Sequence, residues 1–339
     1  MKLKVHDQAL LLLTCIAAVL SANAAAAKGL NPTHLPRDAK WVVHVDFEAI
    51  TDSQLLQKAK QKNPSITNVV NRYLQDRYGV DPTRGLFSLT MFSRDYREFT
   101  GTAILQADYD AQKVKQQLQK AKQHRTTPWN DYTLHTVTLS TEGNPKHNSL
   151  GDETVTLVLY DKNTLLIGSS IDNAKAGVKL LAGNSQSLQG KDSPLLTERA
   201  TTAWIYGAAV DLKELQQHGV AMPVLVQHEK ITWAFGKQDE GQLFEHAGLV
   251  ARSEAVAKKM HSFLKGVVAY ETLWAEGSKP MIALMKNVKV SRDGKTVRFQ
   301  WQGPTDQTVA ALDAAYTRIN TWKPLLLKHK TMPYDGKKK

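Results

Sequence analysis

The sequence predicts an α+β protein made of two related units of largely antiparallel sheet, with helices packed on one face. Strand patterns with a period of two alternate with amphipathic helical stripes along the 339 residues. Two strand pairs flank the turns Asp161-Lys162-Asn163 and Asp293-Gly294, and short turns of this kind join antiparallel strands. The order of elements in the first half also recurs in the second, which predicts an internal duplication.

The first unit is expected to span residues 39–184. It opens on a strand in which Trp41, Val43 and Val45 alternate with His44 and Asp46. Further strands are expected at 86–92, 99–107, 132–139, 154–160 and 164–168. Helices are expected after the capping residues 51–53, and at 66–74, 110–125 and 172–182.

A linker at 185–199, rich in Gly, Ser and Gln, is expected to lead into a second unit at 200–322. Strands are predicted at 203–212, 230–235, 243–251, 283–290 and 296–302. Helices are predicted at 253–267 and from 305 onward. The first of these would bury Val256, Met260, Phe263, Leu264 and Val267 on one face. A single sheet formed by both units is the alternative architecture.

The N-terminus has the layout of a secretory signal peptide at residues 1–24. Lys2 and Lys4 precede an apolar run at 9–22, and Ala22-Asn23-Ala24 supplies small residues for cleavage near Ala24. We therefore expect an exported chain, periplasmic or extracellular, with a flexible lead-in at 25–38. Because Cys15 is the only cysteine, the mature chain would contain no disulfide, catalytic thiolate or zinc site with sulfur ligands.

The chain is basic, with a formal net charge of +12 and a lysine-rich tail at 323–339. This charge favours contact with an anionic envelope surface or with another envelope protein. The helix at 110–125 supplies the predicted anion-docking residues Lys113, Lys115, Lys120, Lys122 and Arg125. Nucleic acid is not expected as a partner, because no aromatic residues accompany these lysines. No transmembrane span is expected in the mature chain.

Residues 35–46 read Leu-Pro-Arg-Asp-Ala-Lys-Trp-Val-Val-His-Val-Asp. This stretch resembles the opening of a family of exported bacterial proteins of unknown function. In that family a signal peptide precedes a Leu-Pro-x-Asp-Ala motif, a Trp-Val-x-His-Val-Asp strand and a duplicated α/β body. The resemblance implies export and fold, and it carries over no catalytic residue.

His44 and Asp46 are the candidate catalytic pair, because residues two apart on a strand project from the same face. They would support a hydrolase or a metal-dependent enzyme only with further ligands, which the sequence does not indicate. It contains no serine-hydrolase elbow, zinc-protease helix or phosphate loop, so neither a cofactor nor a metal is predicted. The expected function is therefore non-catalytic binding or scaffolding of an anionic or protein partner. The alternatives are the enzyme centred on His44 and Asp46, and a carrier of an apolar ligand between sheet and helices.

Overall fold

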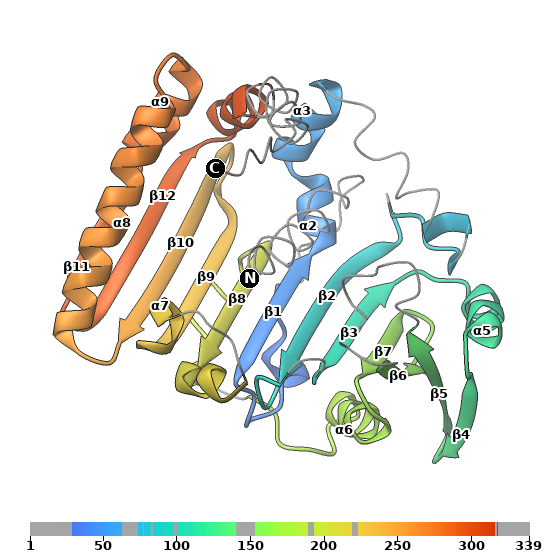
Figure 1. The fold of residues 1–339 in the computed structure, drawn as a ribbon. Helices are drawn as coiled ribbons and strands as arrows, with labels where there is room; N and C mark the ends of the chain where they lie inside the picture. Colours follow the sequence, from blue (N-terminus) through green and yellow to red (C-terminus); the bar gives the residue numbers. More distant parts are fainter. Residues whose placement is uncertain are drawn as a thin grey trace, which may run out of the picture.

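The computed structural model describes residues 29–62, 74–76, 78–82, 84–97, 100–139, 153–188, 193–218, 223–315 and 317. The predicted signal peptide, Cys15, most of the predicted helix at 66–74 and the basic tail lie outside these residues. The described chain forms one antiparallel sheet of twelve strands accompanied by helices, which confirms the α+β class (Figure 1). Among the described residues, no helix combines the length and the apolar character needed to cross a bilayer.

The sheet runs β11-β12-β10-β9-β8-β1-β2-β3-β7-β6-β5-β4. The strands are β1 (Trp41–Asp46), β2 (Leu86–Ser93), β3 (Thr102–Ala107), β4 (Arg125–Trp129), β5 (Tyr132–Leu139), β6 (Glu153–Leu159), β7 (Thr164–Gly168), β8 (Ile205–Val210), β9 (His228–Asp239), β10 (Gln242–Ala251), β11 (Lys289–Asp293) and β12 (Thr296–Pro304). Both predicted hairpin turns are confirmed, since 161–163 joins β6 to β7 and 294 lies between β11 and β12, where Gly294 has a φ of +52°.

The two predicted units are joined in a single sheet, so the alternative architecture is the correct one. The joint is β1, whose residues Trp41 to Val45 pair antiparallel with β8 from Ala209 to Ile205. Outward from this central pair, one side runs β1-β2-β3-β7-β6-β5-β4 and the other runs β8-β9-β10-β12-β11, so the first five strands of each side have the same order and β5 and β4 have no counterpart. On each side, the third strand counted from the central pair (β3 or β10) lies beside the second strand of a hairpin (β7 of β6–β7, or β12 of β11–β12).

The described helices are η1 (Pro32–His34), α2 (Phe47–Asp52), α3 (Gln54–Lys62), α5 (Ala111–Lys120), α6 (Ile171–Leu181), η3 (Leu212–His218), α7 (Pro223–Val226), α8 (Glu254–Trp274) and α9 (Lys279–Lys286). A further helical segment, 305–315, follows β12. Side-chain oxygens of Asp46, Asp110, Ser170 and Ser253 accept backbone N–H groups at the start of α2, α5, α6 and α8.

The helices cover both faces of the sheet, so the prediction of one covered face is wrong. On one face α6 packs with Ile104 and Leu166, whereas α2 and α5 pack on the other face with Leu165. The reason lies in the strands themselves. Leu165 and Leu166 are neighbours in β7 and point to opposite faces, yet both are buried. A strand that is apolar on both sides needs cover on both sides.

The described parts of the predicted lead-in and linker, 29–38, 185–188 and 193–199, contribute buried residues to the core. Within the lead-in, Leu30 and Leu35 are fully buried in the core beneath α6. In the linker, Leu188 donates its N–H to Leu35 O at 2.7 Å, and Ser187 forms an isolated antiparallel β-bridge with Pro36. The described parts of these two segments therefore hold each other in place. They do not mark a gap between domains.

Two local predictions in the second half are wrong, and one edge strand was not predicted. Of the predicted strand 283–290, residues 283–286 belong to α9, which has a proline in its first turn, and only 289–290 belong to β11. In α8, Met260 is buried, but Phe263 and Val267 are exposed to solvent, because the sheet contacts a narrower stripe of the helix than its apolar face. Strand β4 was not expected at all.

Candidate functional site

One row of cross-strand neighbours spans the whole sheet. Residues that face each other in an antiparallel ladder project from the same side, so the row describes one face. Its members, from β4 to β11, are Thr127, Leu134, Val158, Leu166, Ile104, Thr90, His44, Tyr206, Ala234, His246, Gln300 and Lys289. The row changes from apolar to polar and cationic as it crosses the central strands.

The apolar part of this face is covered and the cationic part is open. Leu134 and Leu166 lie beneath α6 with no exposed surface. The segment 305–315 follows β12 as α6 follows β7, but it lies beside α3, where Lys58 pairs with Asp306 (Figure 1). Helix α8 packs on β10 and β12 from the opposite side, against Leu249 and Val297. Among the described residues, no helix covers β9, β10 and β12 on the side that carries His246 and Gln300.

Six cationic or imidazole side chains surround this uncovered surface, which we call the basic face. They are Arg199, Lys230, His246, Lys286, Lys289 and Arg298. Two adjoining pockets of about 520 and 490 Å³ form the surface, and Arg199, His246 and Gln300 line both of them. The site is therefore an open groove surrounded by cationic and imidazole groups, with Glu198 and several apolar residues also in its lining.

Arg199 is held in position by the ring beneath it. Its guanidinium carbon lies 4.5 Å from the centroid of the Phe244 ring, which is fully buried. Guanidinium groups bind the faces of aromatic rings, and this contact leaves the N–H groups available at the rim. The ring of His246 lies 5.2 Å from that of Phe244. The three side chains form one packed unit at the junction of the two pockets.

The electrostatics of the face favour a negatively charged ligand. Lys230 is partly buried, and this burial lowers the pKa of its ammonium group. Burial, and then the charge of Arg199, lower the pKa of His246. Within the described residues, no ion pair joins these cations to a carboxylate within 4.0 Å. A bound anion would supply the missing negative charge.

Carboxylates near the face are few. Glu198 lines the larger of the two pockets. Glu245, on β10, lies on the opposite side of the sheet from His246 and accepts the Trp233 indole N–H at 2.9 Å. The cations of the face therefore outnumber the acidic groups beside them.

The structure places the predicted catalytic candidates in the centre of the sheet, away from the basic face. His44 is buried, and its Nδ1 lies 2.9 Å from Thr90 Oγ1. Asp46 is buried too, and its Oδ1 accepts the Ala49 N–H at 2.8 Å as the cap of α2. The described residues contain no cluster of three or more potential metal ligands. Enzymatic activity at His44 and Asp46 remains an untested prediction.

The predicted anion-docking residues lie near the opposite edge of the sheet. All five are exposed, but only Lys113, Lys115 and Lys120 belong to α5. Lys122 follows the end of the helix, and Arg125 begins β4. The helix ends earlier than expected because the chain turns at Gln123, which has a φ of 53°, to start the β4–β5 hairpin. These cations form an exposed patch around the C-terminal end of α5.

A stacked histidine pair lies beside this patch. The rings of His124 and His135 are 5.4 Å apart and nearly parallel, and His124 Nε2 lies 3.1 Å from His135 Nδ1. Burial is the main reason that the pKa of His135 is lowered, and the charges of His124 and Lys115 lower it further. The charges of His124 and Lys115 therefore disfavour protonation of His135 beside this patch.

No local sequence pattern indicates the basic face, because each strand contributes only one or two of its residues. Lys230 comes from β9, His246 from β10 and Arg298 from β12. Only the register brings them together. The available hint was the reduced apolar content on one side of these strands, where Thr232, Gly248 and Gln300 stand in place of the Ile and Leu of the first half.

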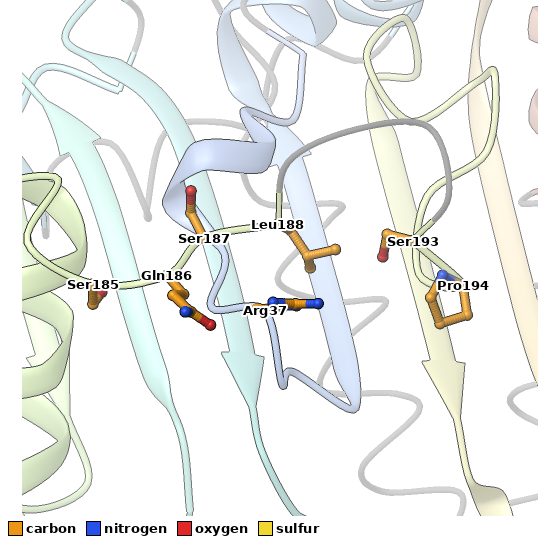
Figure 2. Close-up of a pocket in the computed structure, with 7 residues that line it drawn as sticks. All are labelled: Arg37, Ser185, Gln186, Ser187, Leu188, Ser193 and Pro194. Atoms are coloured by element: carbon orange, nitrogen blue, oxygen red, sulfur yellow. The ribbon is translucent and has the colours of Figure 1, made fainter.

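A second pocket of about 510 Å³ lies where the lead-in meets the linker. Figure 2 shows the side chain of Arg37 lying below Leu188, with hydroxyl and amide groups of the Ser185–Leu188 stretch on one side and Ser193 on the other. The Arg37 backbone N–H donates to Gln186 O at 3.1 Å, which fixes the two segments together. With one cation, this pocket is a weaker anion site than the basic face.

Comparisons with known proteins leave the family open. No family model matches the chain, and no curated protein matches it. One solved structure, titled "Structure of crystal form I of TP0453", aligns with 84% of this chain and 97% of its own, at 7% identity and a TM-score of 0.41. A likeness of this size supports no conclusion about family or function.

Proposed function

We propose that this chain is a non-catalytic binding or scaffolding protein that holds an anionic partner on the basic face. The observation that carries the proposal is the open, cationic half of the sheet face, whose other half is apolar and covered by α6. A strand face left polar and uncovered is accessible to a partner, and unpaired cations select a negatively charged one.

We expect the double variant Lys230→Gln/Arg298→Gln to bind immobilised heparin about tenfold more weakly at about 0.15 M salt, because two charges that meet the polyanion are lost. The matched control is Lys115→Gln/Lys120→Gln on α5, which removes the same net charge from an exposed helix. This control should lose less than about twofold. Equal weakening in both variants would show that only the total charge matters, and the proposal would then fail.

We also propose that the chain works in the envelope, since the first 24 residues support export and cleavage near Ala24. N-terminal sequencing of the protein recovered from an envelope fraction is expected to begin near Ala25. Recovery of the uncleaved N-terminus from the cytosol would contradict this location.

We further infer that the two halves of the sheet are related by duplication. The matching outward strand orders from β1 and from β8 support this. On this reading, the basic face occupies the position that α6 covers in the first half.

A further inference from the structure

The basic face has a periodic arrangement of charge along β12. Thr296, Arg298, Gln300 and Gln302 alternate along this strand and share one face. Since a strand rises about 3.3 Å per residue, successive positions are about 7 Å apart and the four span about 20 Å. The groove is thus long enough for several units of a linear ligand.

Each level of this ladder carries a positive or imidazole group. At the first level, Val250 pairs with Thr296 on one side and with Lys230 on the other, so Lys230 supplies the positive charge. At the second level, the positive charge is that of Arg298 on β12. His246 and Lys289 flank Gln300 on its two sides. At the last level Phe244 pairs with Gln302, and the guanidinium group of Arg199, which lies over the Phe244 ring, supplies the positive charge. Such a spacing fits a chain with recurring negative charges better than it fits a single anion.

The floor of the groove is made of small side chains. Ala234 and Gly248 occupy it, and a Cβ added to Gly248 would lie 2.8 Å from Thr232 Oγ1. Small residues let a ligand approach the strands closely. The hydroxyl groups of Thr232 and Thr296 and the amide of Gln300 are then within reach of it as hydrogen-bonding groups.

The lining argues against other polyanions. The ring of Phe244 is fully buried beneath Arg199, and Tyr206 is buried with its hydroxyl donating to Leu195 O at 2.7 Å. Trp233 also borders the groove, but its indole N–H donates to Glu245 on the opposite side of the sheet. The partly exposed imidazole of His246 packs beside Phe244. The described lining therefore presents no row of exposed rings on which successive bases could stack. Hydroxyl, amide and guanidinium groups suit a ligand rich in both hydroxyls and carboxylates or sulfates.

From these features we propose that the basic face binds an extended acidic polysaccharide laid along β12. This inference rests on the proposed function and narrows it to one class of partner. Arg298 and Lys230 would contact the acidic groups, while Thr232, Thr296 and Gln300 would hydrogen-bond the sugar hydroxyls. The small floor residues would allow the sugar chain to lie close to the sheet.

The test measures binding of the full chain to alginate oligosaccharides of graded length, to polyglutamate of matched charge, to oligothymidylate and to neutral dextran. Affinity for alginate should rise with length until the oligosaccharide spans about 20 Å, and level off beyond it. Alginate should bind at least about tenfold more tightly than polyglutamate or oligothymidylate, because only alginate uses the hydroxyl contacts. Dextran should not bind, because it carries no charge.

A single variant separates hydrogen bonding from charge. Gln300→Leu should weaken alginate binding about fivefold and leave polyglutamate binding unchanged, because it removes the amide without altering charge. Gln116→Leu on exposed α5 is the matched control and should change neither.

If polyglutamate or oligothymidylate binds as tightly as alginate and still depends on Arg298, the polysaccharide inference is overturned while the anion-binding function stands. If no polymer responds to Lys230→Gln/Arg298→Gln, both are overturned. Binding of dextran at the strength of alginate would also overturn the inference, because charge would then have no role.

Discussion

Replacement of Leu166 by alanine is expected to lower the free energy of unfolding by about 2–5 kcal/mol. Leu166 has no exposed surface and lies between Ile104 and Val158 beneath α6. Helix α6 approaches it so closely that a Cβ on Gly177 would lie 2.4 Å from Leu166 Cδ1. The helix and strand cannot close over the lost volume without moving, so a cavity remains.

Urea unfolding followed by circular dichroism measures this change. Leu273→Ala is the matched control, since Leu273 is 64% exposed on α8, and it should shift the free energy of unfolding by less than about 0.5 kcal/mol. A loss below about 1 kcal/mol for Leu166→Ala would mean that α6 is not closely packed on β7, and that this half of the face is also accessible.

Asp46→Asn is expected to stabilise the protein at pH 7–8 by on the order of 2 kcal/mol, and to have little effect near pH 4. Burial is the main reason that the pKa of Asp46 is raised to about 6; Glu48 and Asp52 raise it further, while the Ala49 N–H opposes the rise. In the unfolded chain the carboxyl returns to about 3.8.

The pH dependence follows from these two values. Between about pH 4 and 6 the folded protein keeps a proton that the unfolded chain releases, so stability falls as pH rises through this window. Above about pH 6 the carboxyl is ionised in both states, and the loss of stability is complete. Asparagine removes the titration and retains an oxygen that caps α2. The expected result is a wild-type stability curve that converges with the variant curve at the acidic end.

Chemical denaturation at pH 4, 5, 6, 7 and 8 checks this prediction. Asp110→Asn is the control, because Asp110 caps α5 in the same way but is exposed, and it should change stability by less than about 1 kcal/mol at every pH. Equal stability of wild type and Asp46→Asn at pH 8 would show that the buried carboxylate costs nothing.

The elements that could be predicted are those set by local chemistry. Asp110 and Ser253 bind the first N–H groups of their helices, and Asp293-Gly294 forms the turn between β11 and β12. Each of these signals lies within a few residues of its effect. Strand β4 was missed because it is an edge strand whose first residues, Arg125 and Thr126, are exposed, so no alternation appears.

Features that depend on distant residues could not be predicted. The pairing of β1 with β8 joins residues more than 150 positions apart, and no local pattern encodes that register. The face covered by α6 depends on which strands lie beside β7. The basic face depends on both of these features, because it exists only where the register aligns β9, β10 and β12 and no described helix lies over that side of the three strands.

The pairing of β1 with β8 also has a consequence for how the chain can be divided. Either half expressed alone would present a bare strand edge, with unmatched backbone donors and acceptors along β1 or β8. Such an edge recruits another strand, so isolated fragments would self-associate or aggregate instead of folding as independent modules. Evolution or engineering can therefore vary the outer hairpins of this protein more freely than the central pair of strands, β1 and β8.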